Sequence, residues 1–534
     1  MLVRCFALFM LVLGSSTAVA IGAERPNILV AISDDQSYPY ASAYGEPVIK
    51  TPAFDRVARN GILFHNAFTP CPGCSPMRAA FLTGQHVWQI RNAGTHASSF
   101  PRELETFTGR LRSGGYRIGY TGKPWGPGNY KISGWTENPV GPAFSKKKNK
   151  SPQGISSTDY AGNFDSFLDQ TDASEPFCFW YGGHEPHRSF KKGAGREAGL
   201  STEDVRVPGY LPDDEEIRSD LLDYFVEIQW FDQHLGRMLD SLDKRGLLEN
   251  TIVIVTSDNG MAFPRAKANL YEYGIHMPLA ISWPAGIQQP GRDDRSLVSL
   301  LDVTATIYDV STIQPAASQP LSGHSLKPVF EGKENKSDAV LSGRERHSSS
   351  RYRSLGYPCR SVRTEKYLYI RNLKPERWPA GTPQKYSKAK YDASGKLVSG
   401  DLGPEHGGYH DIDACPSLSW LIKNRTRPEV APFFQAAVAH RPAEELYDIT
   451  NDAACMRNLA SDAAKAEVLE EHRRILDAEA HATGDVRIVA PEKGDVWETY
   501  QRFSSLRWFP EPEWATSDPS SVPDQPWLEE RRPR

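Results

Sequence analysis

The sequence has few cysteines, no excess of basic residues and no apolar segment long enough to span a membrane. Its 534 residues include 7 cysteines and carry a formal net charge of −4. So few cysteines in a chain this long exclude a small disulfide-bonded scaffold. The near-neutral charge gives no overall affinity for nucleic acid, so a local cluster of Lys, Arg or metal must attract any anionic substrate.

The first 23 residues have the pattern of a secretory signal peptide. Arg4 precedes the apolar run 5–13, and small residues follow at 18–20. This order of basic, apolar and small residues is typical of a cleaved secretion signal. We therefore expect cleavage after Ala20 or Ala23 and a mature protein in the periplasm or outside the cell. The pairing of the remaining cysteines stays open.

Short apolar segments alternate with amphipathic ones from residue 24 to about residue 337. Residues 27–33 (NILVAIS) and 251–257 (TIVIVTS) have the composition of buried strands. Residues 213–250 have apolar positions at helical spacing, with acids at the start and Lys244 and Arg245 near the end. Such alternation predicts an α/β domain over 24–337, with a mainly parallel central sheet flanked by helices.

The pattern changes after residue 337. Residues 360–373 and 444–452 are typical of strands in an antiparallel sheet, and residues 464–482 are typical of a helix. We expect a smaller α+β domain at 338–484, followed by a Pro- and Trp-rich tail at 485–534.

Acidic residues follow two of the predicted strands, as Asp34-Asp35 and as Asp258-Asn259-Gly260. In open α/β sheets, ligands bind beyond the carboxyl ends of the strands. Carboxylates gathered there repel one another unless a cation binds between them, and oxygen ligands without histidine suit Ca²⁺ or Mg²⁺. Because Asp and Asn are also common in turns and helix N-caps, these residues alone leave both interpretations open.

The segment 69–85 (TPCPGCSPMRAAFLTGQ) contains two cysteines. We expect a helix that begins after Cys74, which would place Cys74 near the positive helix end, with Arg78 returning to the same place. A thiol redox site formed by Cys71 and Cys74 is an alternative, although that site needs its first cysteine at the helix start. A buried, inert cysteine is a third interpretation.

Five short motifs, in order along the chain, resemble those of the type I sulfatases in the alkaline-phosphatase-like superfamily. They are DD at 34–35, CSPMR at 74–78, GK at 122–123, HEPH at 184–187 and DNG at 258–260, with a basic residue following at Lys267. The resemblance covers nearly the whole mature chain and implies an alkaline-phosphatase-like fold and hydrolysis of sulfate esters or sulfamates. Residues 257–274, 357–379 and 444–460 are most similar to the heparan N-sulfatase branch of that family.

The resemblance implies a role for each matched residue. Cys74 would be oxidised by a maturation enzyme to Cα-formylglycine (3-oxoalanine), and its hydrate, beside Arg78, would be the nucleophile. One Ca²⁺ would be bound by Asp34, Asp35, Asp258, Asn259 and the modified Cys74. The sulfate of a sulfated saccharide would contact Lys123 and Lys267. His184 would protonate the leaving group, and His187 would lie on the substrate side or serve a structural role.

The chain departs from the family pattern at one position. Many relatives read Gly-Lys-x-His in the middle motif, whereas Trp125 takes the place of that histidine here. Trp125 could instead stack on a sugar face. In the smaller domain, Arg344, His347 and Arg360 are candidate contacts to the sugar or to a second sulfate.

These observations predict a secreted, Ca²⁺-dependent sulfatase that acts on a sulfated glycan, with the N-sulfate of glucosamine as a candidate group. An O-sulfatase acting on another polysaccharide, for example a marine algal one, is the nearest alternative. More distant alternatives are a phosphomonoester or phosphonate hydrolase, an inactive polyanion-binding homologue and a thiol redox protein.

Overall fold

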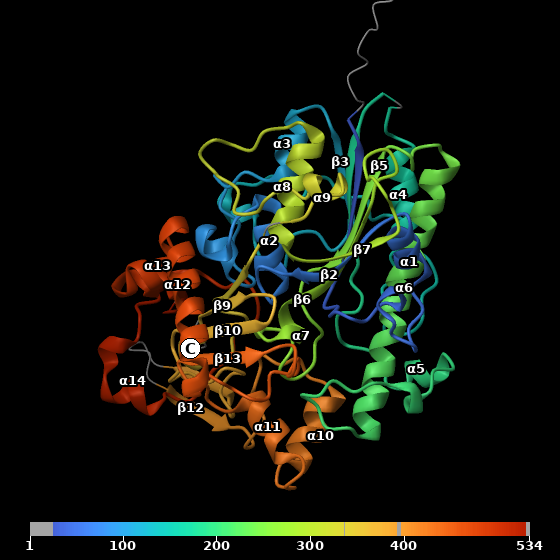
Figure 1. Ribbon diagram of the computed structural model, residues 1–534. Helices are drawn as coiled ribbons and strands as arrows, with labels where there is room; N and C mark the ends of the chain where they lie inside the picture. The colour runs from blue at the N-terminus through green and yellow to red at the C-terminus, as the bar shows by residue number, and fades with distance from the viewer. Residues whose placement is uncertain (1–24, 173, 336, 392–396, 530–534) are drawn as a thin grey trace, which may run out of the picture.

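The structure is a computed structural model that describes residues 25–172, 174–335, 337–391 and 397–529 (Figure 1). The predicted signal segment 1–23 lies outside these residues, so its cleavage stays a prediction. Within the described chain, no helix combines the length and the apolar character needed to cross a membrane.

The larger part of the molecule is built on a seven-stranded sheet with the strand order β3-β4-β1-β5-β6-β2-β7. Its strands are β1 (Asn27–Ser33), β2 (Gly61–Phe68), β3 (Arg117–Gly122), β4 (Phe177–Gly182), β5 (Thr251–Ser257), β6 (His276–Ser282) and β7 (Arg292–Ser299). All neighbours pair in parallel except β6, which is antiparallel to both β5 and β2. The predicted mainly parallel sheet is therefore confirmed.

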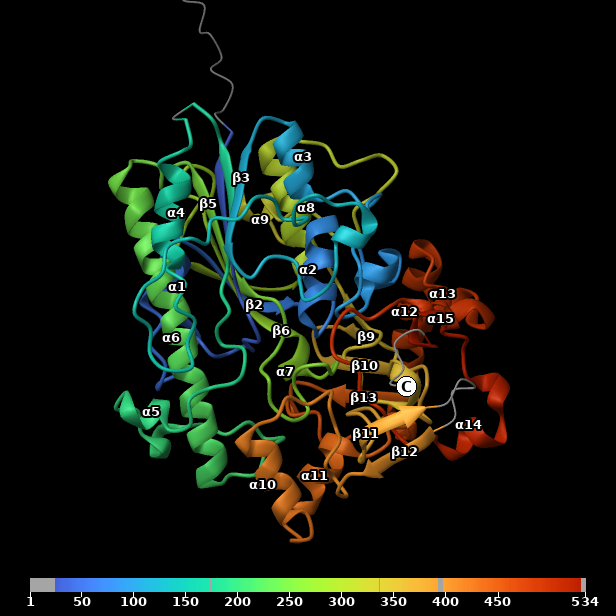
Figure 2. The same ribbon diagram turned by 180° about the vertical axis from the view of Figure 1, so that it is seen from behind.

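Helices cover both faces of this sheet (Figures 1 and 2). One layer contains α1 (Pro52–Arg59), α4 (Tyr160–Leu168) and α6 (Glu215–Lys244), and the other contains α2 (Cys74–Thr83), α3 (Phe107–Ser113), α8 (Leu300–Ser311) and α9 (Lys327–Phe330). Alternate residues of β1 pack toward opposite layers: Leu29 and Ala31 toward the first, Ile28 and Val30 toward the second. A strand buried on both faces explains why residues 27–33 form a continuous apolar run.

A second, antiparallel sheet lies beside the first, with the order β13-β10-β9-β8. Its strands are β8 (Val340–Arg344), β9 (Cys359–Arg363), β10 (Tyr367–Asn372) and β13 (Glu444–Asp448), and α12 (Ala466–Thr483) follows them in the chain. The edge strand β8 contacts the loop that precedes α2, because Gly343 donates its N–H to the Pro70 carbonyl at 2.9 Å. The second sheet therefore lies directly behind the Cys74 loop.

Shorter elements complete the described chain. They are the ribbon β11 (Tyr386–Tyr391) and β12 (Leu397–Leu402) and the helices α5 (Ala194–Glu197), α7 (Glu272–Ile275), α10 (Pro416–Asn424), α11 (Ala431–Val438), α13 (Val486–Val489), α14 (Glu513–Ser517) and α15 (Pro526–Glu529). The final helices lie against the second sheet (Figure 2).

A buried ion-pair network joins β9 to the segment that follows α12. The Arg360 side chain is fully buried, and it donates from Nε to Asp485 at 2.6 Å and from Nη2 to Glu345 at 2.7 Å. Both carboxylates are buried as well. Since these charges are buried away from solvent, each depends on its partners inside the protein.

Replacing Arg360 by Met should lower the free energy of unfolding by about 3–5 kcal/mol, because the change leaves the buried Asp485 without its cation, while Glu345 keeps only Arg487 at 2.8 Å. Urea unfolding followed by tryptophan fluorescence measures the loss. Arg427→Met is the matched control, since Arg427 and its partner Glu429 are both exposed, and it should cost less than about 1 kcal/mol. Equal losses from both variants would contradict the structural role of Arg360.

Candidate active site

The sequence motifs meet at one edge of the large sheet. Asp34 and Asp258 follow β1 and β5, which are parallel neighbours paired from Asn27↔Thr251 to Ser33↔Ser257. Lys123 follows β3 and the segment 184–187 follows β4, at the same carboxyl edge. The site therefore lies where open α/β sheets bind their ligands.

A cluster of potential metal ligands lies at this edge. One ligand atom from each of Asp34, Asp35, Cys74 and Asp258 lies within 4.8 Å of the others, and all four residues are buried. The Cys74 Sγ is 3.4 Å from Asp34 Oδ1. Asn259 donates from Nδ2 to Asp35 Oδ1 at 2.7 Å, while its buried Oδ1 has no hydrogen-bond partner among the described residues. A free amide oxygen beside three carboxylates fits a hard divalent cation such as Ca²⁺.

Three cations neutralise these carboxylates. Lys123 forms an ion pair with Asp34, and Lys267 forms one with Asp35 at 2.7 Å. Burial, the largest single effect, opposes the charge on Lys267, but Asp35 and Asp413, with smaller effects from Cys74 and Asp34, together raise the pKa of Lys267 well above its usual value. Arg78 donates from Nε to Asp258 at 2.8 Å. Burial, together with the neighbouring Asp34, nevertheless raises the pKa of Asp258, as expected where like charges are crowded.

The helix that carries Cys74 begins one residue earlier than expected. α2 starts at Cys74 itself, and Met77 donates its N–H to the Gly73 carbonyl at 3.0 Å. Pro76 is compatible with this start, because the first helical turn needs no N–H from it. The six cysteines in the described part of the chain are all free thiols, so no Cys71–Cys74 disulfide is present. The helix begins at the second cysteine, which does not match a redox site.

The two histidines of the HEPH segment lie at the open side of the cluster. His187 Nε2 is 3.9 Å from Asp35 Oδ2, and His184 is exposed. Desolvation by the surrounding protein lowers the pKa of His184 to about 4, against the opposing effect of Asp34. Solvent reaches the exposed ring, so its desolvation is only partial. Even so, the lowered pKa leaves His184 neutral at pH 7 in the free protein.

The second sheet's domain places residues beside the same site, among them His347, whose predicted contact with substrate stays a prediction. A Cβ added at Gly73 would lie 3.1 Å from His347 Nδ1, so this ring lines the Cys74 loop. His96 packs on His347 with a ring-centre distance of 4.7 Å. Asp413 accepts from Lys267 Nζ at 3.1 Å. Sequence reasoning missed His96 and Asp413, because neither belongs to a motif and both reach the site across long sequence separations.

Arg344 and Arg360 do not reach the site, so the prediction that they contact substrate is wrong. Arg344 is 2% exposed, pairs with Asp411 and donates to the Ala268 carbonyl. Arg360 has no exposed surface and is held by Asp485 and Glu345. The charges of both arginines are paired with buried carboxylates inside the second domain, where these ion pairs connect its loops.

Trp125 is also buried, and the prediction that it stacks on a sugar is wrong. Its side chain is 2% exposed, and its ring meets Phe100 edge to face, with centroids 5.2 Å apart. Its carbonyl accepts a hydrogen bond from Asn138 Nδ2 at 2.9 Å. Trp125 therefore fixes the loop that follows Lys123 by packing.

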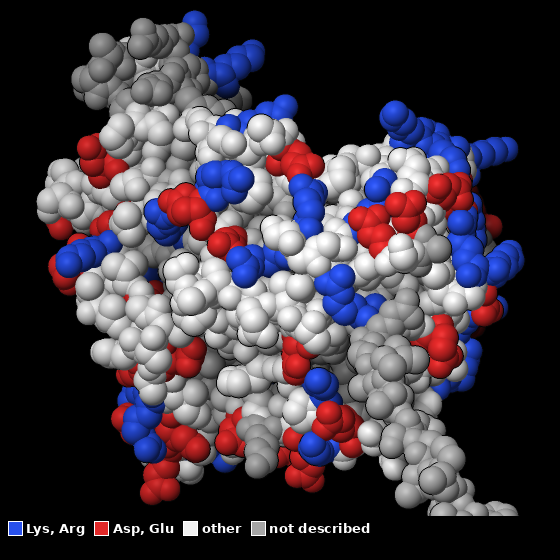
Figure 3. Space-filling view, turned by 90° about the horizontal axis from the view of Figure 1, so that it is seen from above, with Lys and Arg blue, Asp and Glu red and all other residues white. Residues whose placement is uncertain are grey.

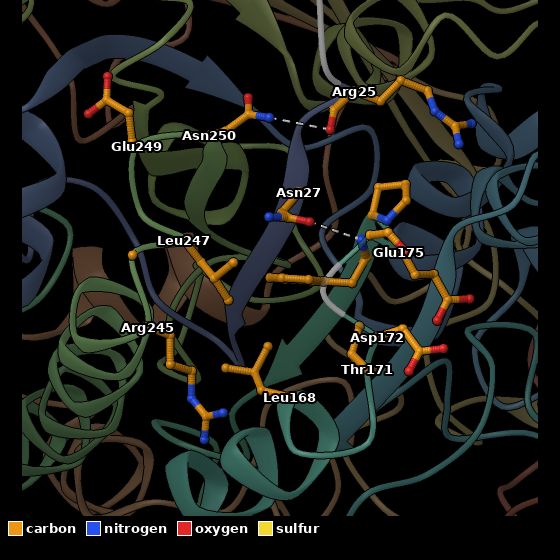
Figure 4. A pocket seen from close by; sticks show the side chains of 14 residues that line it. Arg25, Asn27, Leu168, Thr171, Asp172, Glu175, Arg245, Leu247, Glu249 and Asn250 are labelled. Atoms are coloured by element: carbon orange, nitrogen blue, oxygen red, sulfur yellow. Dashed lines mark hydrogen bonds between the residues drawn. The ribbon is translucent and has the colours of Figure 1, made fainter.

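A cavity of about 460 Å³ lies at the opposite, amino-terminal edge of the sheet (Figure 4). Its polar groups are engaged locally: Asn27 accepts from the Phe177 N–H at 3.1 Å, and Arg25 donates to the Gly114 carbonyl at 2.6 Å. None of the predicted site residues lines it. The motif-bearing edge is therefore a better candidate site than this cavity.

On the face of the molecule seen from above, basic and acidic side chains are interspersed (Figure 3).

Replacing Trp125 by Ala should lower the free energy of unfolding by about 3–5 kcal/mol, because it removes a large buried ring. Trp125→Phe keeps an aromatic group in the same space and should cost far less. Thermal and urea unfolding measure both changes. Unchanged stability in Trp125→Ala, combined with weaker binding of a sulfated saccharide, would restore the sugar-stacking role.

Comparison with known proteins agrees with this geometry. A family model described as Sulfatase matches residues 26–313, and a model described as N-sulphoglucosamine sulphohydrolase, C-terminal, matches residues 265–379. The human N-sulphoglucosamine sulphohydrolase is 29% identical over 526 residues, which cover 91% of this chain and 95% of the relative. An ulvan-active sulfatase from Formosa agariphila is 23% identical over 494 residues, covering 86% and 76%.

Solved structures show the same fold. A protein solved in complex with its substrate D-glucosamine-2-N,6-O-disulfate superposes with a TM-score of 0.60 at 19% identity, covering 87% of this chain and 99% of the other. The sulfatase model includes the Asp34, Cys74 and Asp258 motifs and spans more than half of the 534 residues. The chain therefore belongs to the sulfatase family, whose members hydrolyse sulfate esters or sulfamates.

Proposed function

We propose that this protein is a secreted, Ca²⁺-dependent sulfatase that removes sulfate from a sulfated glycan, with the N-sulfate of glucosamine as its target group. The observation that carries the proposal is the buried cluster of Asp34, Asp35, Cys74 and Asp258, whose ligand atoms lie within 4.8 Å of one another. The similarity to the human N-sulphoglucosamine sulphohydrolase over most of both chains supports the choice of target group.

The cluster fits the two groups that the family uses. Asp34, Asp35, Asp258 and Asn259 would hold one Ca²⁺, since they offer only oxygen ligands and include the unpartnered Asn259 Oδ1. Cys74 would be oxidised to formylglycine. Its hydrate supplies a nucleophilic oxygen and a second hydroxyl that lets sulfate leave afterwards, whereas a simple alcohol or thiol would keep the sulfate.

The chain's own cations would bind and orient the transferred sulfate. Lys123 and Lys267 neutralise Asp34 and Asp35, and in the metal-loaded protein their ammonium groups would donate hydrogen bonds to the substrate oxygens. Arg78, fixed by Asp258 and by the Lys123 carbonyl at 2.7 Å, would hold its charge beside residue 74. Each such donor typically contributes about 2–4 kcal/mol to the stability of the transition state.

His184 would protonate the leaving amine or alcohol. It is exposed on the open side of the cluster, where a substrate can reach it. An anionic sulfate bound nearby favours the protonated imidazole and raises its pKa from the low value of the free protein. Binding of the substrate would therefore favour protonation of His184, so this side chain could donate a proton at a pH where it is neutral in the free protein.

The chain organisation supports the same proposal. The predicted units 24–337, 338–484 and 485–534 would act together, because residues of the second unit reach the Cys74 loop and Lys267. The signal segment 1–23 would direct the protein to the periplasm or the exterior. A formylglycine-generating enzyme would meet the chain as a maturation partner.

An O-sulfatase acting on another polysaccharide is the second candidate, and the similarity to the ulvan-active sulfatase favours it. Sulfate release from N-sulfoglucosamine should exceed release from O-sulfated monosaccharides by at least about tenfold in kcat/KM, which is about 1.4 kcal/mol of transition-state binding. Ion chromatography of released sulfate measures this. Turnover of O-sulfated sugars with an inert N-sulfated one would replace the first candidate by the second.

Mass spectrometry of the peptide 69–85 from protein made in its own host tests the modification. Formylglycine replaces CH₂SH by CHO and lowers the mass of the peptide by about 18 Da, whereas a Cys71–Cys74 disulfide lowers the mass of the peptide by about 2 Da. We expect the loss of 18 Da at Cys74. Cys74→Ala should abolish activity, and Cys71→Ser, the matched control in the same loop, should retain most of it. Equal losses in both variants would revive the redox interpretation.

A further inference from the structure

Three backbone segments lead away from the candidate active site side by side. Ser348 donates from Oγ to the His410 carbonyl at 2.6 Å. Thr382 donates its N–H to the Ser350 carbonyl at 2.8 Å, and Tyr409 donates its N–H to the Thr382 carbonyl at 3.0 Å. The segments 348–350, 382–385 and 409–413 therefore form one connected layer of the second domain, in which 348–350 are buried and 382–385, His410 and Asp413 form the partly exposed surface.

Two of these segments are anchored in the active site. His347 precedes Ser348 and lies against Gly73, and Asp413 binds Lys267. Three residues of extended chain span at most about 11 Å, so His410 lies within that reach of Asp413. A group bound near His410 is thus close enough to belong to a saccharide held at Lys267.

Three basic side chains gather at the outer end of this surface. His410, Lys385 and Arg507 are all partly exposed. Arg507 is tied to the surface by its backbone N–H, which donates to Ser349 Oγ at 2.9 Å. Lys385 is joined to the same region because its neighbour Tyr386 donates its N–H to the Trp508 carbonyl at 2.8 Å.

These cations have no acidic partner within the part of the chain that the structure describes. Neither Lys385 nor Arg507 forms an ion pair there, although most buried or half-buried arginines of this domain do. The adjacent Asp411 is engaged by Arg344 and Arg351. The buried Nε2 of His410 has no hydrogen-bond partner among the described residues.

The three basic groups lie near enough to repel one another. Burial and the nearby Arg507 lower the pKa of Lys385. Burial, Arg507 and Lys385 lower the pKa of His410 to about 4, against the opposing effect of Asp411. Ordinary surface lysines and arginines avoid such a cost by turning into solvent. A bound anion would remove the repulsion and satisfy His410 Nε2.

We propose that Lys385, His410 and Arg507 form a second anion subsite, which binds another acidic group of the glycan while its first sulfate lies at residue 74. This inference rests on the proposed sulfatase function. The acidic group is a sulfate on the same sugar or the carboxylate of an adjoining uronic acid, since both present oxygens to which lysine and arginine donate.

The double variant Lys385→Gln/Arg507→Gln tests the subsite, with Lys390→Gln as the matched control because Lys390 is an exposed lysine on β11. Three substrates are compared: N-sulfoglucosamine, its 6-O-sulfated form, and N-sulfoglucosamine linked to a uronic acid. The double variant should raise KM about 5- to 30-fold for a substrate with the second acid, at unchanged kcat, as loss of charge-assisted hydrogen bonds predicts.

The pattern across substrates identifies the ligand. KM for N-sulfoglucosamine alone should stay unchanged. A higher KM for the 6-O-sulfated form would show that the subsite takes a sulfate, and a higher KM for the form linked to a uronic acid would show that it takes a carboxylate. Lys390→Gln should change none of the three values. Equal effects of the double variant on all substrates, or no effect on any, would overturn the proposal.

A binding measurement separates failure of this subsite from failure of the proposed function. Cys74→Ala protein cannot turn over substrate, so calorimetry reports affinity alone. The double variant in this background should bind the substrate that has a second acid about 5- to 30-fold more weakly and bind N-sulfoglucosamine unchanged. If no N-sulfated sugar is hydrolysed but this selective loss persists, the subsite stands and the proposed activity falls. Equal affinities with and without the two basic side chains overturn the subsite.

Discussion

The crowding of buried carboxylates at the ends of β1 and β5 is the constraint on which the rest of the site depends. Parallel pairing brings Asp34, Asp35 and Asp258 together, and burial makes their mutual repulsion strong. Cations must therefore surround them. Lys123 arrives from the end of β3, Arg78 from the first turns of α2, and Lys267 from the loop after β5. The same positive groups that neutralise the acids are the ones that would bind sulfate under the proposed function.

The second domain completes this charge balance. Asp413 shares Lys267 with Asp35, and His347 closes against Gly73 at the start of α2. The contact is supported from behind, where β8 hydrogen-bonds the loop before Cys74. The second sheet thus supports the Cys74 loop from one side. The interior arginines of the domain are engaged by buried carboxylates, so the proposed second subsite draws on its outer basic residues instead.

Much of the fold and the central cluster could be predicted from the sequence, because the buried strands β1 and β5 are apolar runs that end at the acidic motif residues. The antiparallel direction of β6 could not, since a strand buried on both faces has the same composition in either direction. The burial of Arg344 and Arg360 could not be predicted from the sequence either. An arginine is normally exposed, and only the distant partners Asp411 and Asp485 make its burial favourable. His96 and Asp413 were missed because their contacts join separate parts of the chain.

Trp125 shows how a departure from the family pattern fits the same chemistry. Its ring packs on Phe100 in the interior, so the loop beyond Lys123 is fixed by packing. The Lys123 carbonyl then accepts from Arg78 Nη1 at 2.7 Å and from Trp180 Nε1 at 3.1 Å. This loop therefore positions Lys123 and Arg78 but offers no imidazole to the leaving group. Under the proposed function, the proton donor would then be sought in the HEPH segment, where His184 is exposed and His187 Nε2 lies 3.9 Å from Asp35 Oδ2. The exchange of histidine for tryptophan would leave acid catalysis to that segment.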